Sequence, residues 1–200
     1  MFSPADADLE RGWPGRIEGG TVVQLAAQTL QSFFTGGSSA REHARYPLAD
    51  VLLRAPVLEP PVVRLFEDAA RFSFANPTAV RSPGGEITRP QGRLDVATRL
   101  AAVIGADGAI GGWTGLAEWR APELEAPKDH DFALVLGPVL DTELADSFDW
   151  AAARAFAELN TRLRPGDVLG GPVLALREDV ASGPSELEIP GVGTLHAIVA

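Results

Sequence analysis

The chain has 200 residues, of which 46% are hydrophobic and 22% charged, and its formal net charge is −10. This length and composition are typical of one globular domain, or one and a half, with a sizeable core. The acidic balance argues against nucleic acid or an anionic membrane as the main partner. Because the chain has no cysteine, disulfides, thiolate metal ligands and cysteine nucleophiles are excluded.

The apolar runs, the N-terminal stretch and the turn-forming residues further limit the class of protein to which the chain can belong. No apolar run approaches the roughly 20 residues of a membrane helix. The N-terminal stretch MFSPADADLERGWPGR lacks the basic start and apolar core of a secretory signal. We therefore expect a soluble cytoplasmic protein. Sixteen prolines and 21 glycines predict many turns and a β-rich fold.

The first half of the chain predicts short strands and one helix. GRIEGGTVVQLA is typical of a hairpin that turns at Gly19-Gly20 and returns over Thr21–Leu25. A helix is predicted over residues 26–34. ADVLLRAPVLEPP predicts an edge strand that stops at Pro60-Pro61, and RSPGGEITRPQG a loop.

The second half predicts longer strands and a second helix. Strands are predicted over residues 94–104, 110–116 and 132–136, the last ended by Gly137-Pro138. A helix is predicted over residues 148–163, with Ser147 as its N-cap. The chain ends in two short predicted strands around Gly191.

Five stretches follow one another along the chain: RLDVATRLAAVIGADG, GWTGLAEWRAPELE, KDHDFALVLGPVLDT, LRPGDVL and EIPGVGTLHAIV. In this order they resemble the fumarylacetoacetate hydrolase family. The resemblance implies an α+β, β-rich fold: a mixed β-roll over residues 58–200 behind a small N-terminal sheet module over residues 1–57. It also implies a homodimer, for which the apolar stretch DFALVLGPVL is one candidate contact.

The same resemblance implies a chemistry and a metal site. Relatives cleave, decarboxylate or isomerise 2-oxo or 1,3-dicarbonyl acids, and a bound Mg²⁺ or Ca²⁺ stabilises the enolate that develops. Two glutamates on one strand and an aspartate on the next segment hold the ion. These positions fall on Ala97, Arg99 and Glu118. A lysine of the family falls on His130, although Lys128 matches an earlier lysine of the same motif.

The segment expected to carry the family's lid over the site is also shorter than the resemblance implies. It should lie between Pro61 and Asn76, where VVRLFEDAARFSFAN is too short and has no histidine. A single carboxylate cannot hold Mg²⁺ or Ca²⁺ well against water. Arg99 places a permanent positive charge where the ion would sit. We therefore expect no metal cofactor, with Glu118 as the only residue that could ligate one.

Each remaining site residue has two interpretations. Glu118 is either a surviving ligand or one half of a structural ion pair, and Asp95 is either a substitute ligand or a residue at the start of a strand. His130 is either a general base or a hydrogen-bonded loop residue. Because residues two apart on a strand share a face, Ala97 and Arg99 should both point toward Glu118. An Arg99–Glu118 ion pair is therefore predicted in place of the metal.

Two functions follow from these alternatives. The first is a diverged member of the family that has lost metal-dependent catalysis and serves as a dimeric binding or scaffold protein. The second is a metal-independent hydrolase, decarboxylase or isomerase. It would act on a small oxo or dicarboxylic acid, with Lys128 and His130 as catalytic residues and Arg99 and Glu118 as ligand-binding residues. An open pocket bounded by these four side chains would favour the second function.

Overall fold

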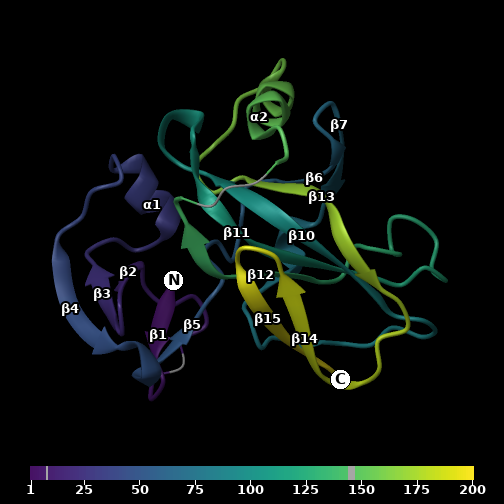
Figure 1. Cartoon of the computed structure of the whole chain (residues 1–200), viewed down its shortest axis with the longest axis horizontal. Coiled ribbons are helices and arrows are strands. Elements are labelled where there is room, and N and C mark those ends of the chain that lie inside the picture. Colours follow the sequence, from purple (N-terminus) through teal and green to yellow (C-terminus); the bar gives the residue numbers. More distant parts are fainter. Residues whose placement is uncertain (8, 144–146) are drawn as a thin grey trace.

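β-Strands make up most of the regular structure in a computed structural model that describes residues 1–7, 9–143 and 147–200 (Figure 1). The helices are α1 (Leu30–Thr35) and α2 (Trp150–Glu158), and short 3-10 turns lie at Leu48–Asp50, Pro77–Ala79 and Ala106–Gly108. The strands are β1 (Phe2–Pro4), β2 (Gly15–Glu18), β3 (Thr21–Leu25), β4 (Glu42–Pro47), β5 (Val51–Leu53), β6 (Val63–Asp68), β7 (Arg71–Ala75), β8 (Val80–Arg81), β9 (Glu86–Ile87), β10 (Asp95–Ile104), β11 (Ile110–Arg120), β12 (Leu134–Asp141), β13 (Val168–Arg177), β14 (Gly183–Ile189) and β15 (Gly193–Val199).

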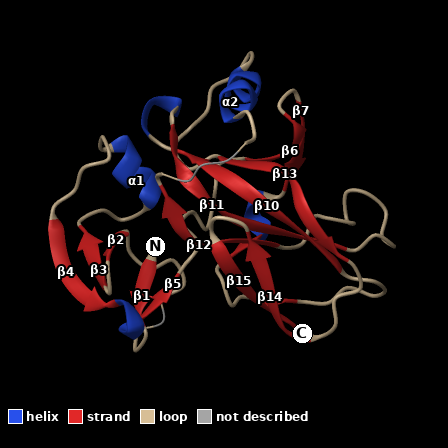
Figure 2. Ribbon diagram, viewed as in Figure 1, coloured by secondary structure: helices blue, strands red, loops and turns tan. Residues whose placement is uncertain are grey.

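A seven-stranded mixed sheet, in the order β7-β6-β13-β10-β11-β12-β8, forms the centre of the molecule (Figure 2). Its neighbours pair antiparallel except for β13 with β6 and β12 with β8, which run parallel. Every residue of β10 is buried, because its two faces carry different parts of the core. The predicted β-rich α+β class is therefore confirmed.

The two faces of the sheet are covered by different elements. On one face, which we call the inner face, Leu65, Ala101 and Leu116 pack with Phe34 of α1. On the opposite, outer face, α2 covers one end of β10 and the β14–β15 hairpin covers the other. Figure 1 shows α2 and this hairpin at opposite ends of the sheet, with α1 beside β11 and β12. The alternation of strand side chains thus sets which residues meet inside the roll.

The first five strands form two small sheets, β1-β5 and β2-β3-β4. Among the described residues, these five strands pair only with one another. The predicted hairpin at Gly19-Gly20 is confirmed by the pairing of β2 with β3. Helix α1 is shorter than predicted, because Thr29 caps it by accepting a hydrogen bond from the Ser32 N–H at 3.0 Å.

The second helix is also shorter than the sequence predicted. Its N-cap is Asp149 and not Ser147, because the Asp149 carboxylate accepts the Ala152 N–H at 2.9 Å. The helix ends before residue 163 because the Leu159 backbone is extended and Asn160 adopts a φ of 59°. Leu163 is nevertheless buried, in the cluster beneath α2.

Four strand predictions need correction. The edge strand predicted to stop at Pro60-Pro61 covers only β5 and ends at Leu53. β11 does not end at Leu116 but continues to Arg120. β12 does not end at Gly137-Pro138 but continues to Asp141. The register of its pairing with β11 shifts between Trp113 and Gly115, and this shift accommodates Gly137 and Pro138 within the strand. The stretch predicted as a loop before β10 contains β9. The stretch where relatives would carry a lid forms the β6–β7 hairpin. No helix among the described residues is long and apolar enough to cross a membrane.

Candidate functional site

Arg99 and Glu118 lie on adjacent central strands and form a buried ion pair on the inner face. β10 and β11 pair so that Ala97 is opposite Glu118 and Arg99 is opposite Leu116. Arg99 Nε donates to Glu118 Oε2 at 3.0 Å, and the two side chains are 5% and 4% exposed. The ion pair predicted from the sequence is therefore confirmed.

The Arg99 guanidinium also bonds to the backbones of two further strands. Its Nη1 donates to Phe66 O of β6 at 3.0 Å and to Gly171 O of β13 at 2.8 Å. The β6–β13 ladder ends at Leu65 and Gly170, so Arg99 supplies donors just where backbone pairing stops. A Cβ at Gly170 would lie 2.8 Å from Leu65, so the glycine allows this side chain to pack closely against β13.

A second cation, which the sequence analysis missed, completes the cluster. Arg120 Nη2 donates to the same Glu118 Oε2 at 2.7 Å, and its side chain is 35% exposed. The signal was present, because Arg120 stands two residues beyond Glu118 on β11 and must share its face. Burial lowers the pKa of Arg99, and the adjacent Glu118 carboxylate opposes that shift. Arginine stays protonated under such conditions, so the cluster has two positive charges and one negative.

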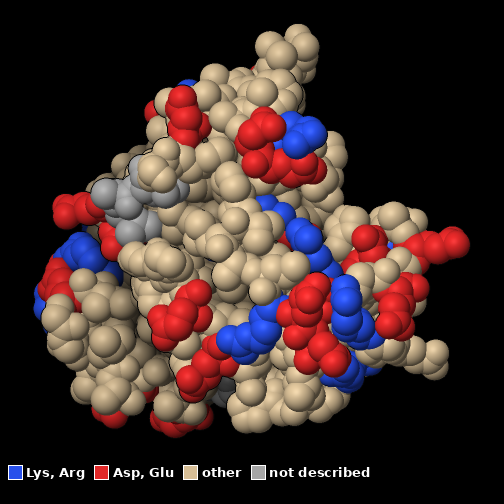
Figure 3. Space-filling model, turned by 45° about the vertical axis from the view of Figure 1, so that its right-hand side comes forward, with Lys and Arg blue, Asp and Glu red and all other residues tan. Residues whose placement is uncertain are grey.

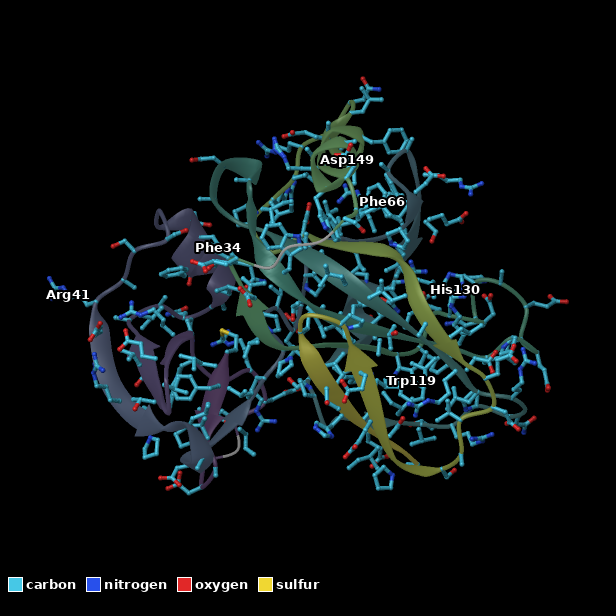
Figure 4. All side chains as sticks on the ribbon, viewed as in Figure 1. Phe34, Arg41, Phe66, Trp119, His130 and Asp149 are labelled. Atoms are coloured by element: carbon cyan, nitrogen blue, oxygen red, sulfur yellow. The ribbon has the colours of Figure 1, made fainter. Side chains whose placement is uncertain are left out.

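Lys128 and His130 lie in the loop after β11 and are paired within it. Lys128 Nζ contacts Asp131 at 2.6 Å, and His130 Nδ1 contacts Asp129 at 2.8 Å. Figure 4 labels His130 on the right of the view, where this loop lies. Within the described ranges, no hydrogen bond or ion pair links either residue to Arg99 or Glu118.

The residues at the metal position implied by the family do not fit a cation. Ala97 has no ligand atom and Arg99 is a cation. The Oε2 atom of Glu118 already accepts hydrogen bonds from the guanidinium groups of Arg99 and Arg120. Asp95, the other acid of β10, accepts the Asp179 N–H at 3.0 Å and pairs with Arg93, which agrees with its structural interpretation. Hard cations need several oxygen donors, and of these three positions only Glu118 carries a carboxylate.

The main pockets of the described residues lie elsewhere. One of about 630 Å³ separates the N-terminal sheets from β12 and is lined by residues such as Phe33, Phe34 and Leu140. Another of about 640 Å³ lies beside the loop after α2. Neither of these, nor two smaller pockets, includes Arg99, Glu118, Lys128 or His130. The open pocket that would favour an enzyme is therefore not among them.

Searches of family models and of curated proteins found no match to this sequence. Solved structures do match. Maleylpyruvate hydrolase from Sphingobium sp. SYK-6 aligns with a TM-score of 0.75 and 19% identity, over 96% of this chain and 97% of that one. 5-Carboxymethyl-2-hydroxymuconate delta-isomerase from Mycobacterium smegmatis gives 0.74 and 21%, over 94% of each chain. 2-Hydroxyhepta-2,4-diene-1,7-dioate isomerase from Mycobacterium marinum gives 0.70 and 22%, over 93% and 92%.

Proposed function

Since the chain has the fold of the fumarylacetoacetate hydrolase family, we propose that it is a diverged relative without that family's metal-dependent reaction. On this proposal it is a cytoplasmic, dimeric binding or scaffold protein. The observation that carries the proposal is the pair of guanidiniums, from Arg99 and Arg120, on one oxygen of Glu118. A divalent cation at Glu118, the only carboxylate among the three positions, would lie beside both guanidiniums and be repelled by them.

The ligand class that we propose follows from the neighbours. Their names include a maleylpyruvate hydrolase and isomerases of 5-carboxymethyl-2-hydroxymuconate and 2-hydroxyhepta-2,4-diene-1,7-dioate. A protein of this fold that retains binding without metal chemistry would take a small oxo or dicarboxylic acid. The excess positive charge of the Arg99–Glu118–Arg120 cluster is compatible with such an anion, and the exposed part of Arg120 is where it would approach.

We expect the purified protein to show no turnover of acylpyruvates or oxaloacetate above buffer in the presence of Mg²⁺ or Mn²⁺. The reason is the absence of free carboxylate ligands at positions 97 and 99. Absorbance assays measure this, with a metal-dependent enzyme of the same fold as the positive control. Turnover that requires metal and disappears in Glu118→Ala would contradict the proposal. Turnover that persists in a chelator and disappears in His130→Ala would support a metal-independent enzyme instead.

We also propose that the protein is a two-fold dimer, but through a surface other than the stretch first considered. Leu134–Leu136 of that stretch is buried within the chain, between β11 and β8. Among the described residues, the second half of β13 has no strand partner on the side of β6, and it exposes Val173, Leu174 and Leu176. An apolar strand with a free edge is normally covered, and a second copy of the chain would cover it.

Light scattering at micromolar concentration should therefore give twice the mass of one chain. The double variant Leu174→Glu/Leu176→Glu is expected to give the mass of one chain, because four carboxylates, two from each chain, would be buried at the interface. Ile198→Glu, at a similarly exposed apolar residue of β15, serves as the control and should remain a dimer. A wild-type mass of one chain would rule out the dimer, and a dimeric double variant would rule out this surface.

A further inference from the structure

A second buried arginine lies on the outer face of the sheet, away from the Arg99–Glu118 pair. Val63 and Leu65 point into the inner core, so Arg64 between them points outward, to the side that α2 covers. Its side chain is 6% exposed. Its guanidinium carbon lies 5.7 Å from the centre of the Phe72 ring and 5.8 Å from that of Phe74. These two rings hold the cation in place.

The hydrogen bonds of Arg64 are far from complete. Of its five N–H groups, one has a protein acceptor among the described residues, Asp167 Oδ2, and the distance is 3.4 Å. Arg64 Nε and Asp167 Oδ1 are buried without a partner in the described structure. Arg99, by contrast, has three acceptors at 3.0 Å or less. Because buried polar groups are normally satisfied, Arg64 lacks acceptors that something else must supply.

A pocket of about 640 Å³ lies against Arg64, in the range typical of small-molecule sites. Two further arginines line it, Arg162 and Arg164, which are both exposed on either side of the buried Leu163. Neither forms an ion pair within the described ranges. Asp167 is the only acid in the lining, so the pocket has two more positive charges than negative ones.

This local charge is opposite to that of the whole molecule. The chain has a net charge of −10, and Figure 3 shows acidic and basic side chains mixed across the visible face. Three guanidiniums around one pocket are thus a local feature. Asp167 fixes the loop that presents two of them, since its Oδ2 also accepts the Arg164 N–H at 3.1 Å. The pocket therefore combines the buried cation Arg64 with the exposed cations Arg162 and Arg164. The Asp167 carboxylate pairs with Arg64 and holds the loop that carries the other two arginines.

We propose that this pocket is a binding site for a small oxyanion, the carboxylate or phosphate group of a small molecule. Guanidinium groups bind both kinds of oxyanion through paired N–H···O bonds. The ligand would supply acceptors for Arg64 and neutralise Arg162 and Arg164. The site is independent of the proposed function, because it lies on the opposite face of the sheet from Glu118.

The test is a titration of the isotope-labelled protein followed by amide NMR shifts. The probes are sodium phosphate and sodium succinate, and sodium chloride at equal ionic strength is the blank. Saturable shifts are expected at residues 160–167 and 62–64 with at least one probe and none with chloride. The probe that binds more tightly identifies the oxyanion as phosphate or carboxylate.

The variant Arg162→Gln/Arg164→Gln should weaken binding about tenfold or more, through the loss of two charge-assisted contacts. Both residues are exposed, so the fold is expected to tolerate the change. Arg11→Gln/Arg41→Gln removes the same charge elsewhere and should change affinity less than twofold; Figure 4 shows Arg41 at the far left, away from α2. The proposal is overturned if neither probe gives saturable shifts at these residues, if chloride reproduces them, or if both double variants bind alike.

Discussion

Replacing Arg99 with methionine is expected to lower the free energy of unfolding by about 3–5 kcal/mol. Methionine keeps most of the apolar stem, so the main loss is the more buried of the two cations that pair with Glu118, and only the part-exposed Arg120 remains beside the carboxylate. Phe66 O and Gly171 O lose their donor at the same time. Urea unfolding followed by tryptophan fluorescence measures the difference, because Trp119 and Trp150 are both buried.

The matched comparison is the double variant Arg99→Met/Glu118→Gln. Removing the charge of Glu118 as well should recover about 1–3 kcal/mol of the loss, since no buried carboxylate that has lost its buried cation is then left behind. Arg45→Met breaks an exposed ion pair with Glu42 and should leave the urea midpoint unchanged. If the double variant were as unstable as the sum of the two single variants, Arg99 and Glu118 would not be coupled.

Replacing Arg64 with methionine should destabilise the protein by about 3–5 kcal/mol near pH 8 and much less near pH 4. Burial already raises the pKa of Asp167, while Arg64 and the Arg164 N–H partly oppose that shift. Without Arg64 this pKa rises further. A carboxyl whose pKa is raised on folding is most favourable to stability below its unfolded value of about 3.9. That stability is lost as the pH rises through the folded value.

Unfolding free energies of Arg64→Met between pH 4 and 8 test this dependence. The double variant Arg64→Met/Asp167→Asn carries no titrating group at position 167. The difference between the two variants should therefore grow with pH, in favour of the double variant. A difference that stays constant over this range would show that the Asp167 carboxyl is not the group responsible.

The sequence predicts best where one strand pairs with its neighbour along the chain. β10 and β11 have long apolar runs joined by a short turn, so their pairing and the meeting of Arg99 with Glu118 follow from side-chain alternation. β13 was not predicted as a strand because Gly170, Gly171 and Pro172 resemble a turn. In the structure these residues form a stretch of strand whose register against β10 shifts around Arg99.

Contacts between distant segments could not be predicted from local patterns. Arg64 and Asp167 are separated by 103 residues, and only the parallel pairing of β6 with β13 brings them together. Nothing near Arg64 in the sequence distinguishes it from a solvated arginine of an edge strand. Likewise, the expected role of His130 at the site depended on the family resemblance, and the loop gives this histidine a neighbouring aspartate instead.

The contacts of Arg99 also bear on the order in which the protein folds. This one side chain joins β10 to β6, β11 and β13, through partners 33, 19 and 72 residues away. All four strands must have docked before all three hydrogen bonds can form, so we expect these bonds to form late in folding. Arg99 therefore stabilises the native sheet more than the transition state for folding. We expect its loss to accelerate unfolding and to leave the folding rate almost unchanged.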